Sequence, residues 1–264
     1  MADEFAVEGS VADEFAAEGF TTLLLDRRPD RLHVRLNRPD VRNAIDQAMV
    51  DELHTVCAEL ELEPRMLIIS GSNGIFASGA DIAQLRERRA ADALQGINSG
   101  LFSRIARLPM PVIAALDGWA LGGGAELAYA ADFRIASTTV RLGNPETALG
   151  IIPAAGALWR LAELVGEPVA KEIILAGRIL NAEEALAVHL VTEVHEPGAL
   201  VAAAHALADR IGAQDPLATS LAKQVFHAPA DAHPQVDNEA QAILFESEAK
   251  FARMSTFLER KKKR

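Results

Sequence analysis

The stretch Ala120-Leu121-Gly122-Gly123-Gly124-Ala125-Glu126-Leu127-Ala128 says most about how this chain folds and what chemistry it can carry. Three consecutive glycines leave the backbone amides uncovered, and the apolar, helix-forming run after them places those amides at the start of a helix. Such a turn can bind an oxyanion. Glu126 lies about one helical turn beyond the bound oxygen, where its carboxyl could move a proton.

A second glutamate, Glu146, follows twenty positions later in Gly143-Asn144-Pro145-Glu146. Each glutamate alone has a simpler explanation, because acidic residues are common in the first turn of helices and Pro-Glu often opens a helix. A glycine triplet alone usually marks a turn, and Leu127 occupies the last glycine position of the dinucleotide-binding pattern, so that pattern is not satisfied. The two glutamates together with the glycine run indicate an acid/base pair.

Composition limits the classes of function. The chain has 264 residues, half of them hydrophobic, and a formal net charge of -11, which is typical of a globular protein without a basic face for nucleic acid or an anionic membrane. The seven histidines are scattered and form no zinc-binding spacing, so we expect no metal site. Cys57, the only cysteine, cannot form a disulfide within the chain and is expected to be a small buried hydrophobe.

The amino-terminal segment is acidic and contains a short duplication. Ala2-Asp3-Glu4-Phe5-Ala6 recurs as Ala12-Asp13-Glu14-Phe15-Ala16. We expect residues 1–19 to form a mobile extension, with a helix that caps the body as the alternative. Because the segment lacks the basic start of a signal peptide and no apolar stretch is long enough to span a bilayer, we expect a cytoplasmic protein.

Short apolar runs predict strands, and longer runs with helical spacing predict helices. Residues 21–25 and 32–36 flank Arg27-Arg28-Pro29-Asp30 and predict a hairpin. Continuous apolar strands separated by helices indicate a mainly parallel sheet with both faces covered, which is an α/β architecture. We expect further strands at 66–70, 112–116, 133–136 and 190–194, helices beginning near Asp46, Ala80 and the glycine run, and then only helices, at 199–211, 216–226, 236–251 and near Ser255.

Several motifs in this order and spacing resemble the crotonase superfamily, and within it the enoyl-CoA hydratases most. The resemblance covers the chain from about Phe20 to its carboxyl terminus. It rests on Leu36-Asn37-Arg38-Pro39 followed by Arg42-Asn43-Ala44, Phe76-Ala77-Ser78-Gly79-Ala80-Asp81-Ile82, the stretch 111–128, Asn144-Pro145-Glu146, and Leu149-Gly150-Ile151-Ile152-Pro153.

The resemblance implies a spiral of ββα units over residues 20–197 and a helical region over 198–264 that assembles trimers or hexamers. It also implies an acyl-CoA thioester as substrate, with coenzyme A as part of that substrate and no separate cofactor. The family's two oxyanion-hole amides fall on Ala80 and Gly123. Its substrate-binding positions fall on Arg42, Ala44, Asp81, Ile82 and Gly122.

Two glutamates at the positions of Glu126 and Glu146 resemble hydratases, which add water to a trans-2-enoyl-CoA and give a 3-hydroxyacyl-CoA. By this resemblance Glu126 deprotonates the water and Glu146 delivers a proton to C2. Two alternatives remain. One is an isomerase or another crotonase-type enzyme that acts on a branched or aromatic thioester, and the other is a non-catalytic acyl-CoA binder.

The chain departs from the hydratase pattern in three places. Ala154 stands where the family usually has a glycine near the water, and Trp159 lies where a polar pair is common. Ala83 replaces a frequent lysine, which leaves Arg42 and the basic tail Arg260-Lys261-Lys262-Lys263-Arg264 as candidates for the coenzyme A phosphates. A solvated tail is an equal alternative for that segment.

Overall fold

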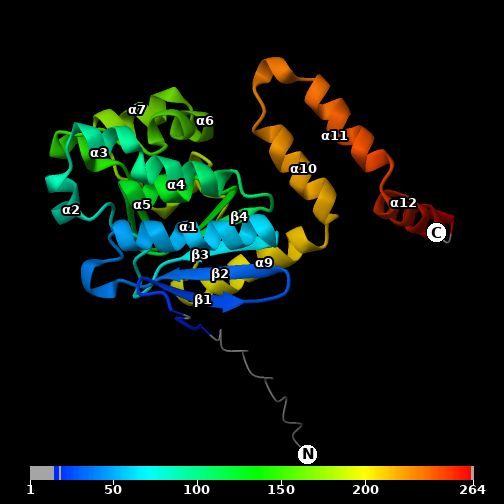
Figure 1. Ribbon diagram of the computed structural model, residues 1–264, viewed down its shortest axis with the longest axis horizontal. Coiled ribbons are helices and arrows are strands. Elements are labelled where there is room, and N and C mark those ends of the chain that lie inside the picture. Colours follow the sequence, from blue (N-terminus) through cyan, green and yellow to red (C-terminus); the bar gives the residue numbers. More distant parts are fainter. Residues whose placement is uncertain (1–14, 18, 263–264) are drawn as a thin grey trace, which may run out of the picture.

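The computed structural model describes residues 15–17 and 19–262 and has a six-stranded sheet at its centre (Figure 1). β1 and β2 form the predicted antiparallel hairpin, and the remaining neighbours pair in parallel. This arrangement confirms the α/β architecture. The strands, in their order across the sheet, are β1 (Leu23–Arg27), β2 (Arg31–Leu36), β3 (Met66–Ser70), β4 (Val112–Leu116), β6 (Phe133–Ser137) and β8 (Glu193–His195).

Both faces of the sheet are covered because its central strands are apolar on both sides. In β3, Leu67 and Ile69 belong to one buried cluster and Met66 and Ile68 to another, as expected when successive side chains point to opposite faces. The first cluster includes residues of α1 (Gln47–Leu62) and α4 (Ile97–Ala106), and the second includes residues of α9 (Leu200–Gly212). Cys57 is buried in α1 as predicted, and burial raises the pKa of its thiol to about 12.

A second, smaller element of the fold carries the glycine run. β5 (Trp119–Leu121) pairs in parallel with β7 (Arg141–Gly143), and α5 (Gly123–Tyr129) starts two residues after β5. The other short helical segments are α2 (Ile82–Glu87), α3 (Ala90–Gln95), α6 (Ala162–Val165), α7 (Glu167–Leu175), α8 (Ala182–Ala187), η1 (Pro39–Val41), η2 (Pro145–Leu149), η3 (Ala157–Leu161), η4 (Pro197–Ala199) and η5 (Ala230–Ala232).

The last three helices form an arm that projects from the body of the molecule (Figure 1). This carboxyl-terminal arm consists of α10 (Pro216–Phe226), α11 (Gln235–Phe245) and α12 (Glu248–Lys262). Apolar side chains of this number on the surface of a single chain are typical of an interaction surface. The exposed ones are Leu217, Phe226, Ile243, Phe245, Phe251, Met254, Phe257 and Leu258.

Three predicted boundaries are wrong. The expected helix at 236–251 is two helices, because the chain leaves the helix after Phe245 and the Ser247 hydroxyl accepts the amide of Lys250 at the start of α12. The short helix near Ser255 is part of α12. The strand at 190–194 is β8, which begins only at Glu193. The helix expected to begin near Ala80 is confirmed and begins at Ile82.

Part of the amino-terminal duplication lies within the described residues. Ala16 exchanges backbone hydrogen bonds with Leu25 of β1, and the Phe15 ring contacts His33 and the Arg35 guanidinium. Residues 15–17 therefore contact the body, and the mobility of the extension over residues 1–19 stays a prediction. The rest of the duplication lies outside the described residues, and the division at 198 stays a prediction, since α9 packs on the sheet.

A buried ion pair ties the arm to the body. The Lys223 ammonium of α10 lies 2.7 Å from a carboxylate oxygen of Asp132 and donates to the carbonyl of Met110 at 3.0 Å. The same carboxylate accepts the amide of Val112 at the start of β4. The pair therefore joins the first helix of the arm to the central sheet.

We expect Lys223→Met to lower the free energy of unfolding by about 3 kcal/mol, because it leaves the Asp132 carboxylate buried without its cation. Asp132→Asn combined with Lys223→Met should recover most of the loss, since no unpaired charge remains. Urea denaturation at one fixed protein concentration measures both effects. Lys171→Met, which removes an exposed pair with Glu167, is the control and should leave stability nearly unchanged, because water screens that pair. An equally small loss for Lys223→Met would contradict the anchoring role.

Candidate active site

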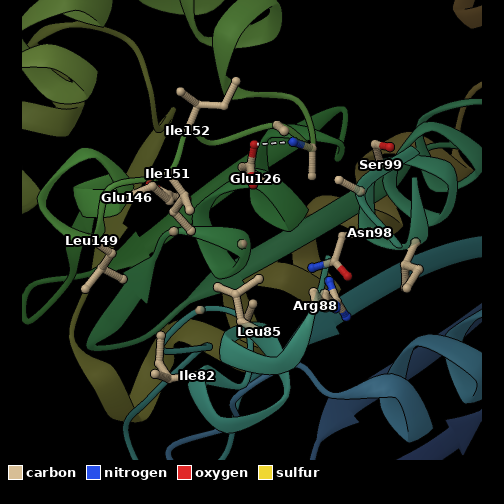
Figure 2. A pocket seen from close by; sticks show the side chains of 18 of the residues that line it. Ile82, Leu85, Arg88, Asn98, Ser99, Glu126, Glu146, Leu149, Ile151 and Ile152 are labelled. Atoms are coloured by element: carbon tan, nitrogen blue, oxygen red, sulfur yellow. Dashed lines mark hydrogen bonds between the residues drawn. The ribbon is translucent and has the colours of Figure 1, made fainter. Parts of the chain in front are cut away.

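A cavity of about 670 Å³ lies beside α5 and brings together segments that are far apart in the sequence. Figure 2 shows Glu126 and Glu146 on its wall, with apolar side chains such as Ile151 and Leu149 beside Glu146. Ala80 and Gly123 also line it. The structure thus gathers both predicted carboxyls and both predicted amides in one cavity.

The amides of Ala80 and Gly123 are available to a ligand. Ala80 is fixed from both sides, because the Ile45 amide donates to the carbonyl of Gly79 and the Ile45 carbonyl accepts the amide of Asp81. A Cβ placed on Gly123 would lie 3.4 Å from the nitrogen of Ala80, so the two segments approach closely. Within the part of the chain that the structure describes, neither amide donates to a protein acceptor. The two amides are therefore suited to form an oxyanion hole.

The flanking glycines serve separate purposes. A Cβ on Gly124 would lie 2.3 Å from the carbonyl oxygen of Ala77, so only glycine lets α5 approach that strand. Gly122 has φ +52°, and its Cβ would lie 3.0 Å from a carboxyl oxygen of Glu146. The triplet is therefore required for packing and for the second carboxyl as well as for uncovered amides.

Glu126 is buried and held by backbone amides. One of its carboxyl oxygens accepts the amide of Ala155 at 2.7 Å and that of Ala157 at 3.2 Å. Burial raises the pKa of this carboxyl to about 7, although the amides of Ala157 and Ala155 oppose the shift, and the nearby charge of Glu146 adds to it. The group can therefore gain or lose a proton near neutral pH.

Glu146 is buried with fewer partners. Its Oε1 lies 3.4 Å from the Asn144 side-chain amide, and its Oε2 is buried without a partner among the described residues. Tyr129 of α5 orients Asn144 by donating from its hydroxyl at 3.0 Å. Burial raises the pKa of Glu146 as well. With both pKa values raised, the two carboxyls are able to hold one proton between them, which supplies one acid and one base.

The remaining predicted site residues divide into two groups. Ile82 and Gly122 line the cavity. Arg42, Ala44 and Asp81 do not: Asp81 accepts the amides of Ala83 and Gln84 and thereby caps α2, while the carbonyl of Ala44 accepts from Arg38. Contact of these three with the coenzyme A part of a substrate stays a prediction.

Several lining residues were missed by the sequence reasoning. Leu85 and Arg88 come from α2 and the residue that ends it, and Asn98 and Ser99 come from α4. They lie in helical stretches without a motif, so no local pattern marks them. Ala154 lines the cavity, as expected from its place after the second glutamate, whereas Trp159 is exposed and does not line it.

One group of side chains elsewhere in the described residues has donors suitable for a metal. Ligand atoms of Asp26, His33 and His205 lie within 4.8 Å of one another. Arg28 already binds the carboxylate of Asp26, and the Ser70 hydroxyl is 2.8 Å from a ring nitrogen of His33. The absence of a metal site stays a prediction.

Known proteins resemble the chain over nearly its whole length. The family model for enoyl-CoA hydratase/isomerase matches residues 32–264. The short-chain-enoyl-CoA hydratase of Clostridium acetobutylicum is 35% identical over 91% of this chain and 95% of its own. The crotonyl-CoA hydratase of Syntrophomonas wolfei is 32% identical over 92% and 97%. The crystal structure of an enoyl-CoA hydratase from Bacillus anthracis superposes with a TM-score of 0.86, at 31% identity over 91% of this chain and 97% of that one.

The raised pKa of Glu126 predicts a pH dependence of stability that one substitution removes. Because the folded-state pKa of about 7 exceeds the ordinary 4.5, the folded protein binds the extra proton between these values, and stability present at low pH is lost as pH rises through 7. We expect the unfolding free energy of the wild type, relative to Glu126→Gln, to fall by about 2–3 kcal/mol between pH 5 and pH 8.

Urea denaturation of both proteins across this range measures the difference. The glutamine carbonyl can still accept the amides of Ala155 and Ala157, so the comparison isolates the titration. Glu183→Gln, at an exposed position on α8, controls for the loss of a glutamate at the surface. Parallel curves for wild type and Glu126→Gln would show that Glu126 keeps an ordinary pKa.

Proposed function

The chain belongs to the enoyl-CoA hydratase/isomerase family of the crotonase superfamily, and from this premise we propose that it adds water to the double bond of a trans-2-enoyl-CoA. The product is a 3-hydroxyacyl-CoA. The observation that carries the proposal is the meeting of two buried carboxyls, Glu126 and Glu146, and two available amides, those of Ala80 and Gly123, in one cavity.

The amides of Ala80 and Gly123 are proposed to hold the thioester oxygen. When water adds at C3, negative charge develops on this oxygen, and donors fixed in place stabilise it without having to reorganise. One such donor is typically worth about 3–4 kcal/mol of the barrier. The close approach of the two segments, 3.4 Å between the Gly123 Cβ position and the Ala80 nitrogen, supports this role.

The two glutamates are proposed to share the reacting water. Glu126 takes a proton from the water as it attacks C3, and Glu146 delivers a proton to C2. The amides of Ala155 and Ala157 stabilise the ionised form of Glu126, which suits a base. Glu146 keeps one buried oxygen without a partner among the described residues, which suits a protonated acid facing a substrate.

The arm is proposed to assemble the protein into trimers or hexamers. Its exposed apolar residues lie on α10, α11 and α12, and α12 continues past them to the basic positions Arg260 and Lys261. Contact with other copies would remove the apolar side chains from water. Among the described residues no helix is both long and apolar enough to cross a membrane.

An assay of hydration tests the reaction directly. Purified protein is mixed with crotonyl-CoA and with longer, branched and aromatic 2-enoyl-CoAs, and the loss of the conjugated thioester absorbance is followed. Loss of absorbance with formation of the 3-hydroxy thioester supports a hydratase. Migration of the double bond without water addition would identify an isomerase, and binding without any change would identify an acyl-CoA binder.

We expect Glu126→Gln and Glu146→Gln each to reduce kcat for hydration by about 10²–10⁴-fold. Because both carboxyls act on one water, the double variant should lose much less than the product of the two single effects. Steady-state kinetics on the best substrate measures this, and Glu183→Gln should be unchanged. Wild-type rates in either single variant would exclude a shared water.

The assembly has its own test. Light scattering should give a mass of three or six chains, and ending the chain after Lys250 should lower that mass, because it removes Phe251, Met254, Phe257 and Leu258. Removing only residues 260–264 is the matched control and should leave the oligomer intact. A monomeric full-length protein would contradict the assembly.

A further inference from the structure

One side of the cavity is polar in a way that hydration of a simple enoyl chain does not require. Arg88 and Asn98 line this side, and in Figure 2 they lie across the view from Glu146 and Leu149. The opposite side carries the apolar residues Leu149 and Ile151. Neither polar residue has a part in the proposed hydration, so we expect them to bind another polar group of the ligand.

Arg88 differs from the arginines on either side of it. The Arg86 side chain points into solvent, 3.9 Å from Glu87, and the Arg89 guanidinium donates to the carbonyls of Arg86 and Arg88. Arg88 is half-buried in the cavity wall, and within residues 15–17 and 19–262 its guanidinium has no hydrogen-bond or ion-pair partner. Its five N–H donors therefore remain available to a molecule in the cavity.

The absence of a partner is unexpected in so acidic a chain. Acidic residues outnumber lysine and arginine by 37 to 26, so a partly buried guanidinium would ordinarily find a carboxylate. Apart from the glutamate pair, the carboxylate in the cavity lining is that of Asp92, and it accepts the amide of Arg89 at 2.8 Å. The positive charge of Arg88 is therefore available to a negatively charged group of a ligand.

Asn98 lies beside the oxyanion hole and, in Figure 2, close to Arg88. Its side-chain nitrogen lies 3.6 Å from the position that a Cβ on Gly123 would take. Its Oδ1 is buried and has no donor among the described residues. A buried oxygen without a donor costs free energy, so this atom is expected to gain a donor when the cavity is filled.

The position of Arg88 favours the acyl end of the substrate over the nucleotide end. Exposed residues line the cavity on two sides, with Ile82, Leu149 and Ile152 on one side and Arg89 and Ala90 beside Arg88 on the other. The proposal places the bulky nucleotide of coenzyme A on the side of Ile82, Leu149 and Ile152. Asn98, next to Gly123, and the half-buried Arg88 lie away from these residues (Figure 2). An acyl chain that starts at the hole and continues past Asn98 would meet Arg88.

We propose that the preferred substrate carries a carboxylate at the far end of its acyl group, bound by the Arg88 guanidinium with Asn98 as a positioning residue. This inference rests on the proposed action on acyl-CoA thioesters. The carboxylate accepts two N–H groups of Arg88, and a third donates to Oδ1 of Asn98 and orients the guanidinium. The substrate class is a 2-enoyl thioester of a dicarboxylic acid.

Binding of saturated thioesters tests the proposal without relying on turnover. Glutaryl-CoA carries the carboxylate, and 5-methylhexanoyl-CoA has the same shape with two methyl groups in place of the carboxylate oxygens. Calorimetry on the wild type should give tighter binding of glutaryl-CoA. Arg88→Gln should weaken the binding of glutaryl-CoA by about 10- to 100-fold, the usual loss for a hydrogen bond to a charged group. It should change the affinity for the neutral thioester by less than about twofold. Arg86→Gln is the matched control and should change neither.

Two results of these binding experiments would overturn the proposal. The first is tighter binding of the neutral thioester by the wild type. The second is an equal loss for both thioesters in Arg88→Gln that disappears with the matching pantetheine thioesters, which would place Arg88 on the coenzyme A phosphates. Asn98→Leu should reduce the preference for glutaryl-CoA over the neutral thioester, and an unaltered preference would remove the positioning role.

Kinetics separates this inference from the proposed reaction. Hydration of 5-methylhex-2-enoyl-CoA at a higher kcat/KM than that of glutaconyl-CoA would support the hydratase reaction and contradict the preference for a terminal carboxylate. Preferential binding of glutaryl-CoA without hydration of any 2-enoyl-CoA would support the carboxylate-binding site at Arg88 and contradict the hydratase reaction.

Discussion

The close approach of two backbone segments is the constraint on which the rest of the site depends. Ala77 donates to the carbonyl of Trp119 and accepts the amide of Leu121, and the Cβ that Gly124 lacks would collide with the Ala77 carbonyl. The start of α5 is therefore fixed against the strand-like segment that ends at Ala80. Because the two amides of the hole come from these two segments, their spacing follows from main-chain packing and does not depend on flexible side chains.

The same packing explains how two carboxyls can be buried together. Glu126 lies in α5, which the packing fixes, and Glu146 follows β7, the partner of β5. Their repulsion is relieved when they hold one proton between them, and the amides of Ala155 and Ala157 stabilise the remaining charge. The buried pair therefore lowers stability at neutral pH. The same burial suits the two carboxyls for proton transfer, as is common where a functional site costs stability.

The sequence was informative wherever a residue type had a local reason to be where it is. The apolar runs of β3 and β4, the glycine triplet and the two glutamates could all be predicted in this way. Asp81 also carries a local signal, as a cap three residues before Gln84, in addition to its place in the predicted binding motif. Arg88 and Asn98 could not be found, because their importance arises only when the residue ending α2 and the first turn of α4 come together on one side of the cavity.

Ala154, which stands where the family usually has a glycine, changes the space in the cavity but leaves the contacts of Glu126 intact. The residues that fix Glu126 are the amides of Ala155 and Ala157, and a methyl group on the preceding residue does not alter their hydrogen bonds. The methyl lines the cavity, so its effect is on the space available to water and acyl group and not on charge. A carboxylate held by Arg88 at the other side would fix the acyl chain at both ends, with the thioester oxygen in the hole. A substrate held in this way loses less freedom when the water attacks, which compensates for a more crowded water site.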